Sequence, residues 1–283
     1  MWRYLRLARP HFLVGGAVLF ALGAFSTHGI DAMAYAVGQA MVTSIQLTAQ
    51  LANEYADAEA DAAVTNRTLF SGGSGVIPSG ALPARAALVG AIISSTMAAI
   101  AIVAMAWISV PTAATGTVAL LVAWVYSTPP VRLLNTGWGE VATSLVVAGL
   151  VPLVGVWSQG GRVGAGLWWA VAALVPIHVA MILCFELPDL DSDAATAKRV
   201  LAVRIGRRAT HRLIVVCAAG AGMLLGFAAR FDGRVPFRLA AVAGLGLTAS
   251  AVAVGIRSRW WSVVTTGAVG SLVVVAGALL AGT

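Results

Sequence analysis

The sequence predicts an all-α, polytopic membrane protein with nine transmembrane helices. Of its 283 residues, 59% are hydrophobic and only 10% are charged, whereas soluble domains carry about 25% charged residues. One soluble domain cannot bury that much apolar surface, so the lipid bilayer is the expected solvent. The whole chain, residues 1–283, is predicted to form a single transmembrane domain.

Nine apolar runs reach the roughly 20 residues that an α-helix needs to cross the hydrocarbon core. The first follows a basic N-terminal segment and is interpreted as an uncleaved helix rather than a signal peptide. Glycine and alanine are abundant in all of them, and small residues let membrane helices pack closely. The runs fall near residues 11–30, 33–52, 86–108, 112–129, 139–157, 165–187, 209–229, 237–256 and 260–281.

The basic residues predict the orientation of these spans. If the N-terminus is cytoplasmic, 14 of the 18 lysines and arginines fall on the cytoplasmic side, as the positive-inside rule requires. The C-terminus is then on the opposite side. The net charge of +7 therefore reflects membrane topology. Nucleic-acid binding is not predicted, because no basic stripe interleaved with aromatic residues is present.

Eight of the 11 acidic residues lie in two short stretches, one after the second run and one after the sixth. The first contains Asn53, Asp57 and Asp61, and the second contains Asp189 and Asp193. A spacing of four places side chains on one helix face, with Cβ atoms about 6 Å apart. Four helices separate the two stretches, so both are predicted to face the same compartment.

Like charges this close repel one another, and a divalent cation removes that conflict. Mg²⁺ prefers one or two carboxylates together with waters and substrate phosphates. We therefore expect the four aspartates to hold Mg²⁺ around a diphosphate. The alternative, that they are solvated loop acids, is weak for two matched pairs. It is the expected role of Glu59 and Asp191, which lie off the paired faces.

A diphosphate also requires positive charge. Arg67 follows the first acidic stretch by six residues, and Lys198, the only lysine, follows the second by five. Arginine suits bidentate phosphate contacts, whereas lysine acts as a point charge. Arg132 and Arg199 are further candidates. The alternative for all four is an anchoring role at the cytoplasmic face.

Tyr126 lies near the end of the fourth run, one turn before Pro129 and Pro130 stop the helix. It lies at the predicted depth of the carboxylates, so its ring could stabilise a cation; the alternative is an interfacial tyrosine. The glycine-rich segment 71–75 lacks the ending of a P-loop and is either a lid or a linker. His178, deep in the sixth run, is expected to have a packing role.

Together these motifs resemble the UbiA superfamily of intramembrane prenyltransferases. Residues 53–61, Asn-x-x-x-Asp-x-x-x-Asp, resemble its first aspartate-rich motif, and residues 189–193, Asp-x-x-x-Asp, resemble its second. Further similar segments are Leu7–Pro10, Asn66–Thr68, Ser71–Ser74, Tyr126–Pro130 and Lys198–Gly206.

The resemblance implies a nine-helix bundle around a central cavity with a cytoplasmic cap. Mg²⁺ and a prenyl diphosphate would bind under that cap, with the isoprenoid tail extending toward membrane lipids. The family's motif residues would be Asn53 and the four aspartates. Its phosphate-binding residues would be Arg67 and Lys198, and its tyrosine near the end of the fourth helix would be Tyr126.

Within the superfamily, Glu186-Leu-Pro-Asp189 looks most like the dihydroxynaphthoate prenyltransferase branch of menaquinone biosynthesis. That implies transfer of the isoprenoid to an aromatic acceptor. Phe185 and Ala197 depart from the residues common in that branch, Asn and Gly, which weakens the assignment of the acceptor. A UbiA-type terpene cyclase and a prenyltransferase with a non-aromatic acceptor remain alternatives. An ion-coupled secondary transporter is an alternative of another class, although transporter sites usually lie near the bilayer midplane.

Overall fold

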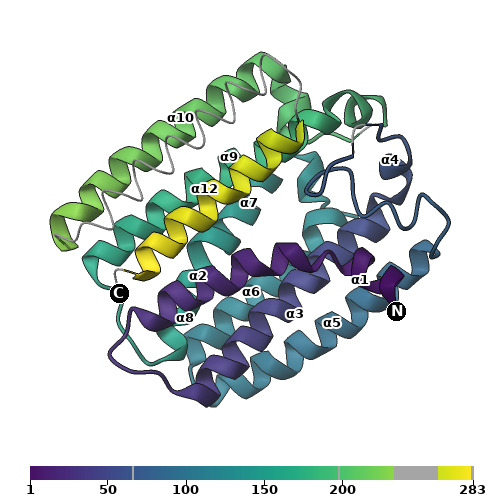
Figure 1. Cartoon of the computed structure of the whole chain (residues 1–283). Coiled ribbons are helices and arrows are strands. Elements are labelled where there is room, and N and C mark those ends of the chain that lie inside the picture. The colour runs from purple at the N-terminus through teal and green to yellow at the C-terminus, as the bar shows by residue number, and fades with distance from the viewer. Residues whose placement is uncertain (66, 197, 233–260, 282–283) are drawn as a thin grey trace.

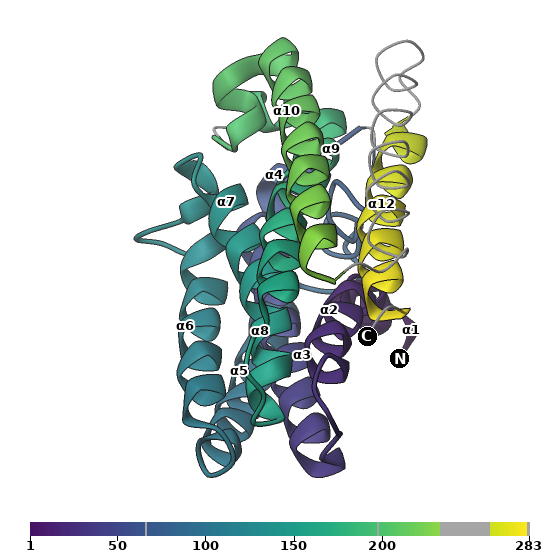
Figure 2. The ribbon, with the colours of Figure 1, turned by 90° about the vertical axis from the view of Figure 1, so that its left-hand side faces the viewer.

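The computed structural model describes residues 1–65, 67–196, 198–232 and 261–281, and within them the regular structure is entirely helical. The long helices lie side by side in one bundle (Figure 1). Figure 2 shows that most of them run along a common direction. The predicted all-α architecture is confirmed.

The first half of the chain supplies four long helices and the segments that join them. Asp31 caps α3, since its Oδ1 accepts a hydrogen bond from the Ala34 amide at 2.9 Å. Pro111 lies in the first turn of α6, which ends just before Pro129 and Pro130. The elements are α1 (Trp2–Ala8), the 3-10 turn η1 (Pro10–Phe12), α2 (Leu13–Phe25), α3 (Ala32–Ala56), α4 (Ala58–Ala62), α5 (Ala84–Ala106) and α6 (Val110–Ser127).

The second half contains the longest helices. A π-helical stretch, η3, joins α7 to α8 and makes them one continuous span. Gly206, with φ 78° and ψ 161°, breaks α10 near its start. The elements are η2 (Leu133–Asn135), α7 (Gly139–Ser144), η3 (Leu145–Leu150), α8 (Val151–Ser158), α9 (Ala165–Ala195), α10 (Leu201–Asp232) and α12 (Trp261–Ala281).

Among the described residues, six helices are long and apolar enough to cross a membrane, or seven if the bent pair formed by α1 and η1–α2 counts as one span. The 25-residue α3 is long enough, but it carries a row of polar side chains that includes Gln46, Gln50 and Asn53. The predicted span at 237–256 lies outside the described residues. The total of nine therefore stays a prediction.

The lipid-facing side of the bundle is clearest on α5. Most of its buried positions are small, among them Ala87, Ala91 and Ala98, whereas Ile92 and Ile100 are 51% and 65% exposed. Small residues at helix contacts allow close approach in membranes, and large apolar side chains face lipid without cost. This arrangement agrees with the membrane location that the composition predicts.

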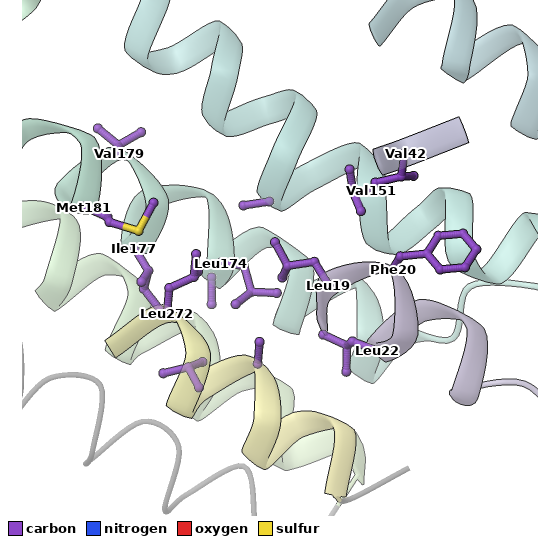
Figure 3. Packing of buried hydrophobic residues seen from close by; sticks show 14 of the residues in the cluster. Leu19, Phe20, Leu22, Val42, Val151, Leu174, Ile177, Val179, Met181 and Leu272 are labelled. Atoms are coloured by element: carbon purple, nitrogen blue, oxygen red, sulfur yellow. The ribbon is translucent and has the colours of Figure 1, made fainter. Parts of the chain in front are cut away.

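The core joins the N-terminal and C-terminal helices. Figure 3 shows Leu272 of α12 next to Leu174 and Ile177 of α9, with Leu19 of α2 also in this buried cluster. Glycine permits backbone contact between α2 and α8, because a Cβ atom on Gly155 would lie 2.3 Å from the Phe20 carbonyl oxygen.

Candidate active site

A cavity of about 340 Å³ lies inside the bundle. Residues of α3 from Met41 to Asp57 line one wall, a length of about 24 Å at 1.5 Å per residue. The wall from α9 includes Ile182 and Asp189. Aliphatic and small side chains line most of its length, and acidic side chains line the part near the C-terminal ends of α3 and α9.

All four aspartates predicted as metal ligands line this cavity, and each is at most 7% exposed. Asp57 and Asp61 come from the junction of α3 and α4, whereas Asp189 and Asp193 come from the last turns of α9. The Asp61 amide donates to the Asp57 carbonyl at 2.8 Å, so the four-residue repeat continues across the end of α3. Asn53 lines the same wall.

Lys198 joins the two aspartate pairs. Its Nζ atom lies 3.1 Å from Oδ2 of Asp57 and 3.5 Å from Oδ1 of Asp193. Burial disfavours the charged amine, but the nearby carboxylates of Asp57, Asp193 and Asp61 outweigh it and hold the pKa of Lys198 above its ordinary value. The ammonium therefore remains charged between the two motifs.

Two further polar side chains contact Asp57. The Asn53 amide nitrogen donates to its Oδ2 at 3.0 Å and to the Ser127 hydroxyl at 3.1 Å. Arg132 approaches from the rim, with one guanidinium nitrogen 3.3 Å from Oδ1 of Asp57. Asp57 thus has the most polar contacts of the four aspartates, and these contacts come from three separate parts of the chain.

The glycine-rich segment after α4 lies directly against the first motif. Arg67 holds it in place, donating from Nε to the Gly72 carbonyl at 2.5 Å and from a terminal nitrogen to the Asp61 carbonyl at 2.8 Å. Gly73 has φ +67°, and a Cβ atom there would lie 1.9 Å from Oδ2 of Asp61. Only glycine allows the backbone this conformation and this approach.

The residues present fit a cation that is also coordinated by its substrate. Oδ1 of Asp189 is buried and has no hydrogen-bond partner, which is unfavourable for a carboxylate unless a ligand completes it. No group of three or more His, Cys, Asp or Glu side chains forms a self-sufficient metal site in the described part of the chain. A Mg²⁺ ion that takes phosphate and water oxygens needs no such group.

The carboxyl of Asp61 has an unusually high pKa. Burial is the main cause that raises the pKa of its carboxyl to about 7; Lys198 opposes the rise, and Asp57 and Glu54 add to it. A carboxyl with this pKa carries a proton part of the time near neutrality. A cation that binds there must displace that proton.

The other predicted residues take different positions. Tyr126 is half-buried and lines the cavity. Arg67 is part of the loop behind Asp61. Arg199 is exposed and donates to the Ala194 and Lys198 carbonyls at 3.4 and 3.2 Å. Neither Arg67 nor Arg199 belongs to the cavity lining, so their contact with a diphosphate stays a prediction.

Two charged residues that had no predicted site role complete the polar end. Arg9 lines the cavity and lies 3.7 Å from Glu54, whose carboxylate accepts the Ser74 amide and hydroxyl at 2.7 and 2.6 Å. The Arg9-Pro10 pair signals a helix break, but no sequence spacing relates it to residues that far along the chain. Glu54 could have been suspected from its place beside Asn53.

The match to known proteins agrees with this arrangement. Residues 12–259 match the model of the UbiA prenyltransferase family. The chain belongs to the UbiA prenyltransferase family. No curated protein matches it in sequence. The resemblance predicted from the motifs is therefore confirmed at the level of the family, and the menaquinone branch stays a prediction.

Solved structures of UbiA homologues share the fold. A homologue from Archaeoglobus fulgidus bound to GPP and Mg²⁺ superposes with a TM-score of 0.73 at 16% identity, covering 99% of both chains. The same homologue bound to DMAPP and Mg²⁺ gives 0.74 at 16% identity and the same coverage. A homologue from Aeropyrum pernix K1 gives 0.72 at 16% identity over 96% of both chains. Membership of a prenyltransferase family leaves the transporter alternative without support.

Proposed function

We propose that this UbiA-family prenyltransferase transfers an isoprenoid chain from a prenyl diphosphate to an aromatic acceptor in quinone biosynthesis. The observation that carries the proposal is the convergence of two aspartate pairs, from α3–α4 and α9, at one end of a long apolar cavity. Lys198 lies between these pairs. A diphosphate matches the polar end, and an isoprenoid tail matches the apolar length.

Mg²⁺ is the proposed cofactor. The A. fulgidus homologue of the same fold is bound to Mg²⁺ together with GPP or DMAPP. Here Asp57, Asp61, Asp189 and Asp193 would hold it, and the unpartnered Oδ1 of Asp189 supports this assignment. When bound, Mg²⁺ supplies Lewis-acid neutralisation that makes diphosphate a better leaving group.

The chain's own cations assist the same step. Lys198 and Arg132 already lie within 3.5 Å of the motif carboxylates, so they can neutralise an anion bound beside them. Asn53 offers an amide donor at the same level. Arg67 and Arg199 are proposed to reach the diphosphate once their guanidinium groups leave their present carbonyl partners.

The remaining walls protect the reacting carbon. The ring of Tyr126 faces the cavity and is the proposed stabiliser of the positive charge that develops on the isoprenoid. Beyond it the lining includes Val122, Val147 and Ile182. These side chains offer water no hydrogen bonds, and a dry wall slows capture of the cation by water.

The acceptor and the sidedness are the finer parts of the proposal. The Glu186–Asp189 segment supports an aromatic acceptor of the dihydroxynaphthoate type. The basic residues support a cytoplasmic N-terminus and site, with the C-terminus on the opposite side and the tail of the donor toward membrane lipids.

A turnover assay tests the proposal. The purified full-length protein is supplied with Mg²⁺ and geranylgeranyl or farnesyl diphosphate, with and without 1,4-dihydroxy-2-naphthoate. Diphosphate release is followed and lipid products are identified by mass spectrometry. We expect a prenylated naphthoquinol, detected as the quinone after oxidation in air, and loss of turnover when Mg²⁺ is chelated.

Two results would change the proposal in different ways. Diphosphate release with a cyclic or hydrolysed terpene, and no adduct, would favour a terpene cyclase. Adducts formed only with a non-aromatic acceptor would overturn the assignment of the acceptor and leave the donor site intact.

A further inference from the structure

Two buried carboxyls lie beside the site and hold the start of α10. Glu140, in the first turn of α7, is fully buried, and Glu186 of α9 is 9% exposed. Oε1 of Glu140 accepts the Leu201 amide at 2.8 Å, and Oε2 of Glu186 accepts the Ala202 amide at 3.1 Å. Because Leu201 and Ala202 are consecutive, their amides bring Glu140 and Glu186 together, although these residues lie on helices far apart in the sequence.

The two carboxyls are neighbours, because they accept hydrogen bonds from consecutive amides. Oε2 of Glu140 is buried and has no hydrogen-bond partner among the described residues. The other titratable groups near the pair are Tyr126 and Lys198.

Only one member of the pair reaches the cavity. Glu186 lines it together with Tyr126 and Asp189, whereas Glu140 is not part of the lining. Glu186 lies three residues before Asp189 on α9, which is about 4.5 Å along the helix axis. If the diphosphate of the donor lies at Asp189 and its tail extends into the cavity, the first carbon of the isoprenoid lies level with Glu186.

We infer that Glu186 is a catalytic residue that accepts the hydroxyl proton of the aromatic acceptor, with Glu140 as its positioning residue. The inference rests on the proposed function. The carbon–oxygen bond of the donor breaks, and its electron pair leaves with the diphosphate. The hydroxyl O–H bond of the acceptor breaks, its proton passes to Glu186, and the oxygen's electron pair moves through the ring into the new carbon–carbon bond.

Apart from the aspartates, the other base in the cavity wall is His178, whose Nδ1 is already hydrogen-bonded to the Ser144 hydroxyl at 3.0 Å. A buried carboxylate that takes up a proton becomes neutral, which suits an apolar surrounding. As the ring regains aromaticity, the C–H bond of the alkylated carbon breaks and its proton passes to the released diphosphate, while the proton on Glu186 returns to the oxygen. The aspartates are unsuited to this role, since they are proposed to hold the cation.

The test measures ionisation and transfer separately in the full-length enzyme. Diphosphate release and adduct are quantified together for Glu186→Gln, with geranylgeranyl diphosphate, Mg²⁺ and 1,4-dihydroxy-2-naphthoate or 4-hydroxybenzoate. Because the glutamine carbonyl can still accept the Ala202 amide, the fold is expected to persist. We expect diphosphate release within about threefold of wild type and adduct reduced about 100-fold, the scale of a lost general base.

A pH series supplies a readout that a purely structural role would not change. An acceptor hydroxyl that ionises by itself needs no base, and phenols ionise near pH 10. The adduct yield of Glu186→Gln should therefore rise about tenfold per pH unit toward the wild-type yield. Asp191→Asn, which changes an 89% exposed carboxylate on the same helix, should behave as wild type at every pH. Glu140→Gln should lose less than tenfold.

The outcomes are distinct. Wild-type adduct yield in Glu186→Gln at neutral pH would overturn the inference and leave the proposed function standing. Equal loss of diphosphate release and adduct in Glu186→Gln and Glu140→Gln would assign both residues to anchoring α10 alone. If the wild-type enzyme forms no adduct with either acceptor, the proposed function fails first and the inference fails with it.

Discussion

The ammonium of Lys198 lies 3.1 Å from Oδ2 of Asp57, so a residue just before α10 neutralises a residue at the end of α3. The same ammonium lies 3.5 Å from Asp193. This contact joins the two aspartate motifs before any substrate arrives. The positive charge of Lys198 also offsets the repulsion among the four buried carboxyls, which lie in one small volume.

Lys198→Met should destabilise the metal-free protein by about 3 kcal/mol, because it leaves buried carboxylates without their cation. Thermal unfolding in detergent measures the effect. Mg²⁺ should restore more stability to this variant than it adds to the wild type, and Lys198→Arg, which keeps the charge, should fall between them. A metal-free Lys198→Met protein as stable as wild type would show that the contact contributes nothing.

The raised pKa of Asp61, about 7, predicts a pH dependence of Mg²⁺ binding. Below about pH 7 the carboxyl is protonated and the cation must displace the proton, so apparent affinity should increase from pH 6 to pH 8 and then level off. The stability of the metal-free fold should depend on pH in the opposite direction. Its stabilisation by protonated Asp61 is complete below the unfolded pKa and is lost as pH rises toward 7.

Mg²⁺ titrations followed by thermal shift at pH 6 and pH 8 measure this dependence. Asp61→Asn removes the titrating group, so the remaining affinity of that variant should change less with pH. Equal wild-type affinities at the two pH values would contradict the assignment of Asp61 as a ligand that loses a proton.

Gly73→Ala should disrupt the first motif. The new Cβ would lie 1.9 Å from Oδ2 of Asp61, so the loop or the carboxylate must move. Gly80 provides a matched control, since its φ is +71° but nothing lies within 4 Å of a Cβ there. Both variants should lose about 1 kcal/mol of stability from the left-handed backbone.

Only Gly73→Ala should also raise the KM for prenyl diphosphate, by roughly tenfold or more for a displaced ligand. Steady-state kinetics of the two variants distinguish backbone strain at the substituted glycine from displacement of the Asp61 carboxylate. Equal KM values in both would mean that the contact between Gly73 and Asp61 has no part in donor binding.

Tyr126→Phe should keep most of the turnover rate, because the aromatic face remains. Tyr126→Leu should lose roughly 30-fold, the rate equivalent of a desolvated cation–π contact of about 2 kcal/mol. Single-turnover measurements separate this effect from product release. If Phe costs as much as Leu, the hydroxyl and not the ring is the important group.

Much of this site could be predicted from the sequence, because helical periodicity fixes faces over short distances. The four-residue spacings at Asp57–Asp61 and Asp189–Asp193 placed both pairs toward the interior. Side chains in irregular segments were harder. Arg67 donates to the Gly72 and Asp61 carbonyls, and Arg199 donates to nearby carbonyls. Helical periodicity could not predict these contacts, because it does not determine the path of a loop after a helix ends.

Partners far apart in the chain were the other difficulty. Glu140 is a lone acid in an apolar run, and nothing in its neighbourhood indicates that Glu186 lies beside it. Arg9 pairs with Glu54 through the folding of the first helix against α3. These contacts depend on how helices pack, which the apolar pattern of each helix leaves open.

Mg²⁺-dependent diphosphate release in Asp189→Asn tests the central claim most directly. Asp189 has a buried oxygen without a partner, and the isosteric amide removes its charge while keeping its volume. We expect wild type and the exposed-site control Asp191→Asn to release diphosphate with Mg²⁺, and Asp189→Asn to insert normally but to release almost none. Release by Asp189→Asn at the wild-type rate, or release by the wild type that continues after Mg²⁺ is chelated, would contradict a role of these aspartates in holding Mg²⁺.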